Sequence, residues 1–298
     1  MALVKKSPRF IKPGVGGTVQ RPAKSETYAL PTKRIQPSTD FGDYGTAIFG
    51  EKGIGKTSLA AEFPNAIINQ FEVGRNHLAV FQVPERGQPK LNWDSFRSYL
   101  EQQLTDDRFQ SIVIDTIDKA YSHCMDYVSR KNGVEHPHDA KDFGKTWNAV
   151  TKEFGEVMDS IKQAGKTPVW LSHAKHKTIE MSHSRQTLEK YCPTCVDKAM
   201  EYLQSCADFV FCYTYDEAGN RIIIPRGNET VWASCGVPDT FMDAKTGEPL
   251  SQFAIGSTAA EAYRNLCDGF ANKLTGEVVS PAPEKEVKRR KFIKKSGE

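Results

Sequence analysis

The sequence predicts an α/β protein with a mostly parallel central sheet, helices flanking that sheet, and an antiparallel hairpin near its C-terminal end. Three observations lead to this prediction. Apolar strand-like runs alternate with segments of helical periodicity along residues 41–275. The first of these runs passes directly into the pattern Gly-x4-Gly-Lys-Thr. A later run, Ser111–Asp115, has three apolar residues followed directly by a carboxylate.

The Gly-x4-Gly-Lys-Thr segment is typical of a phosphate-binding P-loop. Residues 45–49 form the expected strand, and residues 56–63 the expected helix, which Pro64 ends. Glycines between them let the backbone turn tightly and point N–H groups at an anion. We expect Lys56 to reach the β- and γ-phosphates, where it also supports catalysis, and the Thr57 hydroxyl to bind Mg2+. The nucleotide-binding residues expected from the pattern are Gly50, Glu51, Lys52, Gly53, Ile54, Gly55, Lys56, Thr57 and Ser58.

The strand expected at residues 110–115 has the form of a Walker B segment. Asp115 ends the strand at the edge of the sheet where ligands bind, so we expect it to hold the water shell of Mg2+. Asp118 is expected instead to begin the following helix, residues 117–131, where an acidic residue is favoured. The two motifs together predict a protein that binds ATP with Mg2+.

The remaining elements follow from apolar runs and helical spacing. In residues 143–164 the side chains of Trp147, Val150, Phe154, Val157 and Ile161 recur as a core-facing stripe. A turn at residues 216–220 predicts a hairpin between its flanking strands. The further expected strands are 66–71, 167–172, 208–214 and 221–225, and the further expected helices are 92–104, 143–164, 196–206 and 258–272.

Two polar residues stand at predicted strand ends near the phosphates. Glu72 follows the second strand and is a candidate general base for the water that attacks ATP. His173 follows the run Pro168–Ser172, where it is a candidate sensor of the γ-phosphate. An exposed loop glutamate and a hydrogen-bonded structural histidine are the alternatives.

Residues 174–198 are expected to form a long polar and basic loop at the same edge of the sheet. Its cations and ring side chains suit single-stranded nucleic acid, through phosphate contacts and base stacking. The expected DNA-binding residues are Lys175, Lys177, Arg185 and Lys190. Cys192 and Cys195, with His176 and His183, form an alternative zinc site; incidental cysteines are the simpler interpretation.

The charge distribution separates two basic ends from an acidic middle. Residues 1–35 carry eight Lys or Arg against the single acid Glu26, and residues 284–298 carry seven against three. We therefore expect a disordered basic arm at 1–40, a core domain at 41–275 and a disordered basic tail at 276–298, with nucleic acid as the polyanion that the ends contact. Solvated ends that only improve solubility are the alternative.

Other features of composition bear on location. Seven cysteines scattered through 298 residues suggest reduced thiols. With neither a membrane-spanning stretch nor a signal peptide in the sequence, we expect a cytoplasmic protein without a membrane partner.

Several segments resemble phage-encoded RecA-like nucleotide-binding proteins, which include ATP-dependent single-strand annealing proteins of phage recombination systems. The resemblance covers residues 43–235. The segments that carry it are Tyr-Gly-Thr-Ala-Ile-Phe-Gly-Glu-Lys-Gly-Ile-Gly-Lys-Thr-Ser-Leu-Ala-Ala-Glu-Phe-Pro from residue 44, Glu72, Ser-Ile-Val-Ile-Asp-Thr-Ile-Asp, Gly-Lys-Thr-Trp before a long helix, Trp-Leu-Ser-His-Ala-Lys, and Asp-Phe-Val-Phe at 208–211.

This resemblance implies a RecA-like P-loop core, Mg-ATP binding, and a homo-oligomer with the nucleotide near a subunit interface. It also implies single-stranded DNA binding and the host cytoplasm as location, with a single-strand-binding protein as a further partner. Glu72 takes the position of the catalytic base and His173 that of the γ-phosphate sensor. Gln70 and Val73 depart from the family, which often has an acid and a glycine at these positions.

The function that the sequence favours is an ATPase, stimulated by DNA, that binds single-stranded DNA and promotes annealing or recombination in phage DNA replication. One alternative is a P-loop kinase for a small molecule, although no compact arginine cluster suggests the lid that such kinases use. Another is a nucleotide-switched oligomeric scaffold with negligible turnover, which the departures at Gln70 and Val73 keep open.

Overall fold

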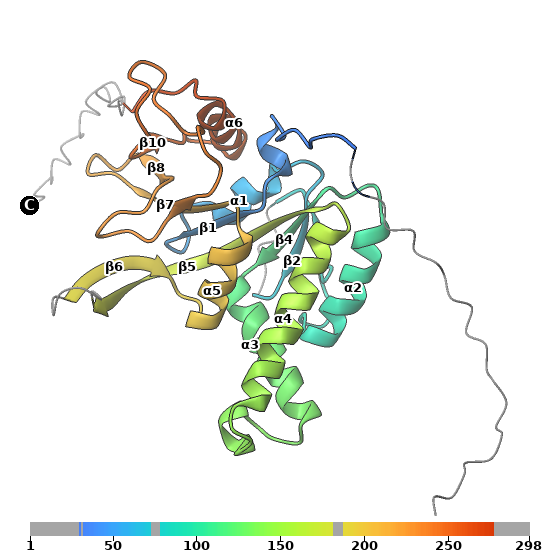
Figure 1. The fold of residues 1–298 in the computed structure, drawn as a ribbon. Coiled ribbons are helices and arrows are strands. Elements are labelled where there is room, and N and C mark those ends of the chain that lie inside the picture. Colours follow the sequence, from blue (N-terminus) through green and yellow to red (C-terminus); the bar gives the residue numbers. More distant parts are fainter. Residues whose placement is uncertain (1–29, 31, 73–77, 181–186, 277–298) are drawn as a thin grey trace, which may run out of the picture. The chain divides into compact units, whose positions relative to one another are not determined.

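The computed structural model describes residues 30, 32–72, 78–180 and 187–276. The chain divides into two units, Met1–Pro37 and Ser38–Glu298. In the first unit, the described residues 30 and 32–37 contain no helix or strand. The second unit holds the sheet and its helices, and the description below concerns this unit (Figure 1).

One sheet organises the second unit, with the strand order β10-β8-β7-β1-β5-β4-β2-β3. All pairings from β3 to β7 along this path are parallel, and β8 and β10 add antiparallel strands at one edge. The strands are β1 Thr46–Gly50, β2 Ile67–Gln70, β3 Phe81–Val83, β4 Ser111–Asp115, β5 Thr167–Glu180, β6 Thr187–Pro193, β7 Phe209–Tyr215, β8 Arg221–Ile224, β9 Ser234–Cys235 and β10 Phe253–Ala254. The predicted fold class, with its mostly parallel sheet and C-terminal antiparallel strands, is confirmed.

Helices cover both faces of the sheet. They are α1 Lys56–Ala61, α2 Trp93–Thr105, α3 Ile117–Lys131, α4 Lys145–Gln163, α5 Asp197–Cys206 and α6 Ala259–Phe270, with short 3-10 turns η1 Phe41–Asp43 and η2 Pro137–Ala140. Side chains from α2, α3, α4 and α5 form one buried cluster, whereas those from η1, α1 and α6 form another. Neighbouring residues of β1 alternate between the clusters, since Ala47 and Phe49 join the first and Ile48 joins the second.

The predicted elements agree with the structure to within a few residues at most ends, with one clear exception. The predicted long loop at 174–198 is wrong: β5 continues through Glu180 and pairs antiparallel with β6, and α5 begins at Asp197. Figure 1 shows this β5–β6 hairpin extending away from the sheet. Strands β3, β9 and β10 were not predicted either, because each has only two or three residues.

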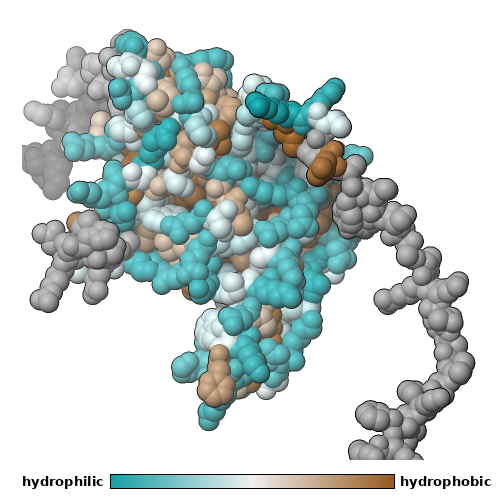
Figure 2. Space-filling view, in the orientation of Figure 1, coloured by the Kyte–Doolittle hydropathy of each residue, from teal (hydrophilic) through white to brown (hydrophobic). Residues whose placement is uncertain are grey.

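The stripe predicted on α4 is partly wrong. Val150, Phe154 and Ile161 are buried, and Met158 joins them. Trp147, in contrast, is 36% exposed, and Val157 is only partly buried. Trp147 lies in the first turn of α4, close to the exposed Phe143, so this end of the helix extends beyond the sheet that buries the rest. Figure 2 shows a mostly hydrophilic surface over α3 and α4, with apolar atoms at the end where the two helices connect.

Aromatic packing holds η1 against the α1 and α6 face. The ring of Phe41 lies within 6.3 Å of the ring centroids of Phe63, Phe209, Phe211, Phe241, Tyr263 and Phe270. Phe41 is only 1% exposed. This contact joins the segment before β1 to strand β7 and helix α6, and so ties the two ends of the described core together.

Phe41→Ala should lower the free energy of unfolding by about 3–5 kcal/mol, because it leaves a cavity among packed aromatic rings. Phe143→Ala is the control, since Phe143 is fully exposed and its loss should change stability by less than about 0.5 kcal/mol. Urea unfolding followed by circular dichroism measures both changes. Equal, small effects of the two variants would contradict the assigned packing.

Candidate functional site

The P-loop connects β1 to α1, and two of its glycines are required by geometry. Gly55 precedes α1 with φ 116°, a left-handed conformation that side chains rarely adopt. Gly50 ends β1 beside β7, where an added Cβ atom would lie 2.1 Å from the backbone oxygen of Tyr213. Only glycine fits these two positions, and the sequence has glycine at both, so the chain can adopt this loop.

Lys56 and Thr57 begin α1 and turn inward. The Lys56 ammonium donates hydrogen bonds to the backbone oxygens of Gly50, at 2.8 Å, and Glu51, at 2.9 Å. Its side chain therefore folds back across the loop whose N–H groups are expected to bind phosphate. Lys56 is 5% exposed and Thr57 is 6% exposed, so both polar groups are removed from bulk water.

The two expected magnesium ligands lie together. The Thr57 hydroxyl donates a hydrogen bond to Oδ2 of Asp115 at 2.8 Å, which joins the start of α1 to the end of β4. Mg2+ in nucleotide sites usually keeps water and phosphate ligands beside one or two protein oxygens. The hydroxyl and carboxylate pair therefore fits Mg2+ bound with a nucleotide.

Glu72 and His173 meet across the sheet edge, although 101 positions separate them in the sequence. Nε2 of His173 lies 3.1 Å from Oε1 and 3.3 Å from Oε2 of Glu72. The Thr116 hydroxyl donates a further hydrogen bond to Oε1 at 3.3 Å. The three residues follow or end the sheet parts of β2, β5 and β4, so neighbouring strand ends assemble this contact.

The Glu72 carboxylate is stabilised in its ionised form. The hydrogen bond from His173 holds the pKa of Glu72 below its ordinary value, and the neighbouring Thr116 and Lys119 act in the same direction, while burial opposes them. Because an ionised carboxylate only accepts hydrogen bonds, Nε2 of His173 is the donor. Glu72 is therefore already deprotonated at neutral pH, as a general base must be.

One pocket collects most of the predicted residues. Its lining consists of Gly53, Lys56, Thr57, Gln70, Glu72, Asp115 and His173. Thus the P-loop, the Walker B acid, the predicted base and the predicted sensor share one cavity. Gln70 also lies there, beside Asp115 in the pairing of β2 with β4.

Three expected DNA-binding residues share one face of the β5–β6 hairpin. Lys177 pairs with Lys190, and Lys175 lies two residues before Lys177 on the same strand. Two of them have partners: Lys175 donates to the backbone oxygen of Thr194 at 3.1 Å, and Lys177 forms an ion pair with Asp197. Arg185 lies outside the described residues.

Cys192 and Cys195 are both buried, and burial raises the pKa of Cys195 to about 12. Within residues 30, 32–72, 78–180 and 187–276, no group of three or more His, Cys, Asp or Glu is placed to hold a metal ion. His183, a member of the alternative zinc set, lies outside the described residues. His176 instead packs on Tyr191 across the hairpin, with ring centroids 5.1 Å apart.

Sequence reasoning missed a polar cluster that joins the hairpin to α3. The carboxylate of Asp118, in the first turn of α3, accepts hydrogen bonds from the hydroxyls of Ser172 and Thr194. Thr194 also donates its backbone N–H to the oxygen of His173. Thr116 was missed as well, although its position directly after Asp115 is a signal that could have identified it.

The fold and the site together define a P-loop nucleotide-binding protein. A family model described as an AAA domain, AAA_24, matches residues 43–234, and the chain belongs to this family of P-loop NTPases. The family implies use of a nucleotide, usually with Mg2+. In the described part of the chain, no helix is both long and apolar enough to cross a membrane.

Two further comparisons give more distant similarities. The SPbeta prophage-derived uncharacterized protein YorG of Bacillus subtilis (strain 168) is 26% identical over 133 residues, which are 43% of this chain and 40% of that protein. The chain therefore matches less than half the length of this relative. The crystal structure of a KaiC-like protein from Pyrococcus horikoshii OT3 covers 64% of this chain and 83% of its own, with 13% identity and a TM-score of 0.36. This similarity is weak, and the strand order of the sheet defines the fold.

His173→Ala should raise the pKa of Glu72, because the change removes its largest stabilising hydrogen bond and leaves the opposing effect of burial. The shift is measured by NMR titration of labelled glutamate carboxyls, with Glu72→Gln to assign the signal. A lowered pKa in the folded state stabilises the fold above the unfolded pKa, and this contribution is lost as pH falls. The variant should therefore also lose part of its stability at neutral pH.

The control in this titration is Glu261, whose pKa is lowered by hydrogen bonds from Ser257. The pKa of Glu261 should be the same in His173→Ala as in the wild-type protein. An unchanged Glu72 signal would show that His173 does not hold the carboxylate.

Proposed function

We propose that this protein binds and hydrolyses ATP with Mg2+. We propose further that ATP controls its affinity for single-stranded DNA during annealing or recombination in phage DNA replication. One observation carries the proposal. An ionised glutamate, held by His173 and Thr116, shares a pocket with Lys56, Thr57 and Asp115. Membership in a P-loop NTPase family and the similarity to a prophage-derived protein support it.

The hydrolysis step assigns a role to each side chain. Glu72 accepts a proton from water as the water oxygen attacks the terminal phosphorus, and the bond to the ADP oxygen breaks. Lys56 and the amides of the P-loop stabilise the charge on the transferring group. Thr57 and Asp115 would hold Mg2+, which would neutralise charge on the phosphate oxygens.

His173 connects the nucleotide site to strand β5 and so to the β5–β6 hairpin. It lies beside Gly50 in the pairing of β5 with β1, next to the P-loop, and it also contacts Glu72. A γ-phosphate near Glu72 and His173 would compete with this contact. Since His173 lies within β5, a change in its position acts directly on the strand that continues into the hairpin.

A second connection supports coupling between nucleotide and hairpin. Asp118 follows the Walker B segment by three residues and accepts hydrogen bonds from both Ser172 and Thr194. The Oδ2 atom of Asp118 is buried and has no hydrogen-bond partner among the described residues.

The hairpin has chemistry that suits a single strand of DNA. Lys175, Lys177 and Lys190 share one face of the hairpin and can neutralise phosphates. His176 and Tyr191 pair on the opposite face, and the Tyr191 ring packs against Phe49, so the DNA contact that we propose is made through phosphates. Lys175 and Lys177 already have hydrogen-bond or ion-pair partners, which makes them less available to bind phosphate. Lys190 is therefore expected to contribute most to DNA binding. The basic ends of the chain, residues 1–35 and 284–298, would add contacts that do not depend on nucleotide. We further propose a homo-oligomer that acts with a single-strand-binding protein in the host cytoplasm.

A nucleotide-switched scaffold with negligible turnover is the second candidate. The observation that favours it is the pair of donors on Glu72, because a base that is held by His173 and Thr116 needs to be released before it can accept a proton. ATP would then order the oligomer without being consumed. Turnover distinguishes the two candidates.

Single-stranded DNA should increase phosphate release by the wild-type protein, and Glu72→Gln should lower that release by about 100-fold or more while ATP still binds. The amide keeps the shape of the side chain but cannot take the proton. A phosphate-release assay with and without DNA measures both effects. Lys56→Ala, which should not bind ATP, is the matched control for background turnover.

Normal turnover by Glu72→Gln would place the base elsewhere. Absence of wild-type turnover with DNA, combined with ATP-dependent assembly, would support the scaffold. Transfer of phosphate to a small molecule instead of water would support the kinase alternative.

Changing Lys175, Lys177 and Lys190 together to Gln should erase the difference in DNA affinity between the ATP and ADP states. Each phosphate contact on a single strand contributes about −0.7 to the slope of log K against log salt, so the slope should become shallower by at most about 2. Deleting residues 284–298 removes seven cations and should change the slope by at most about 5, equally with either nucleotide. Salt titration of DNA binding measures these slopes.

The charge-matched control changes three exposed lysines elsewhere, Lys90, Lys152 and Lys273, to Gln. It should leave the ATP effect intact. If tail deletion abolishes the ATP effect while the hairpin variant keeps it, the hairpin is a subunit contact and the tail is the controlled DNA site.

A further inference from the structure

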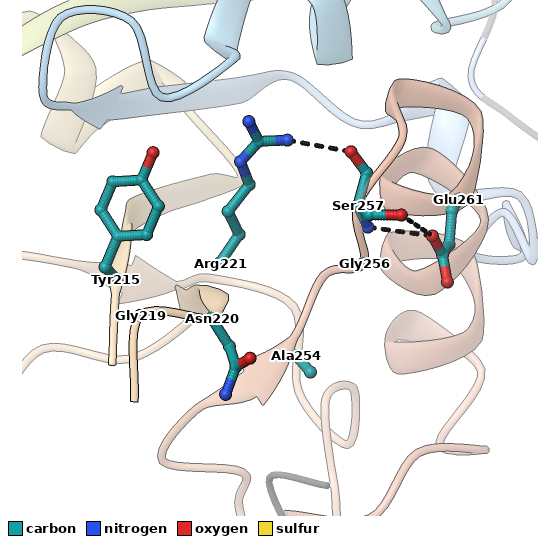
Figure 3. Close-up of a pocket in the computed structure, with 8 residues that line it drawn as sticks. All are labelled: Tyr215, Gly219, Asn220, Arg221, Ala254, Gly256, Ser257 and Glu261. Carbon is teal, nitrogen blue, oxygen red and sulfur yellow. Dashed lines mark hydrogen bonds between the residues drawn. The ribbon is translucent and has the colours of Figure 1, made fainter. Parts of the chain in front are cut away.

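A second cavity, separate from the pocket around Lys56, lies beside the β7–β8 hairpin. Its volume is about 540 Å3, within the range of small-molecule sites. Tyr215 and Arg221 line it from the two strands, and Gly256, Ser257 and Glu261 line it from the start of α6 (Figure 3). Nothing in the proposed hydrolysis step uses these residues.

The cavity adjoins the P-loop through strand β7. Gly50, the first P-loop residue, pairs with Tyr213, and the Tyr213 hydroxyl lies 3.5 Å from the position of a Cβ atom on Gly55. Alternate residues of a strand share a face, so Tyr215 lies on the same face as Tyr213, one step further along β7. The cavity therefore begins directly beyond the tyrosine that touches the P-loop.

The walls of the cavity are suited to a flat ring. Tyr215 is 43% exposed, and it pairs across the hairpin with Arg221, so both side chains project from the same face. Figure 3 shows the Tyr215 ring and the Arg221 guanidinium side by side. The backbone oxygen of Ser257 accepts a hydrogen bond from Nη1 of Arg221 at 3.0 Å, which holds one end of the guanidinium. Aromatic rings and guanidinium planes are the groups on which nucleobases stack.

The α6 side of the cavity argues against a second phosphate site. The Glu261 carboxylate accepts hydrogen bonds from the backbone N–H of Ser257 at 2.9 Å and from its hydroxyl at 3.2 Å. These donors are therefore already occupied by an anion. Gly256 has φ 89°, and an added Cβ atom would lie 2.4 Å from Cδ of Glu261. Glycine at this position therefore lets the backbone pass close to the carboxylate.

We propose that this cavity receives the base and ribose of the nucleotide whose phosphates bind at the P-loop. The proposal rests on the proposed function and extends it, since it assigns recognition of the nucleoside to Tyr215 and Arg221. The base stacks on the Tyr215 ring beside the guanidinium, while the triphosphate lies toward Gly55 and Lys56. Nucleoside and phosphate recognition then come from different strands on the two sides of Tyr213.

Isothermal titration with Mg-ATP and, separately, with Mg-tripolyphosphate tests this assignment, because tripolyphosphate has no base or ribose. Tyr215→Ala should weaken ATP binding at least about fivefold, from the loss of base stacking. It should change tripolyphosphate binding less than about twofold. Tyr215→Phe, which keeps the ring, should bind both ligands as the wild-type protein does.

Two controls separate this proposal from the proposed function. Lys56→Ala should lose both ligands, and retention of both would contradict the P-loop assignment itself. Phe143→Ala, which removes an exposed aromatic ring elsewhere, should alter neither. If Tyr215→Ala leaves ATP affinity unchanged, or weakens ATP and tripolyphosphate equally, the cavity does not hold the nucleoside.

Discussion

The register of β1 with its two neighbours is the constraint on which the site depends. Gly50 lies opposite His173 of β5 on one side and opposite Tyr213 of β7 on the other. This alignment places the predicted sensor beside the P-loop and brings the backbone of Tyr213 so close that no side chain fits at Gly50. A shift by one residue would exchange the two faces of β1 and separate these groups.

The two sides of β1 carry different kinds of side chain at the edge of the sheet where the site lies. Toward β5, β4 and β2, the polar groups form two hydrogen-bonded contacts in one pocket, Thr57 with Asp115 and Glu72 with His173. Toward β7 and β8, the second cavity presents the Tyr215 ring and the Arg221 guanidinium beside the polar groups of Asn220, Ser257 and Glu261. A ligand with an anionic end and a flat aromatic end matches this division, because the two halves of the sheet edge differ in the same way.

The sequence predicted the sheet and the P-loop well because both depend on local patterns: apolar runs of four to seven residues and a glycine spacing that only one backbone shape satisfies. It failed for the β5–β6 hairpin, since the described residues 174–178 and 187–191 are polar on both faces and show no alternation that marks a buried side. Trp147 was misplaced because helical spacing cannot tell where the sheet under a helix ends. The contact between Glu72 and His173 depends on strand order, which no local pattern specifies.

Strand β5 is a single element that starts in the middle of the sheet and ends in the hairpin, and this continuity gives it the mechanics of a lever. From His173 to Glu180 there are seven residues, which in an extended strand span about 23 Å. A tilt of about 5° at the nucleotide end would displace the far end by about 2 Å, a distance comparable to the length of a hydrogen bond. A small adjustment around the His173 imidazole would thus be amplified along the strand without any part of the core having to unfold.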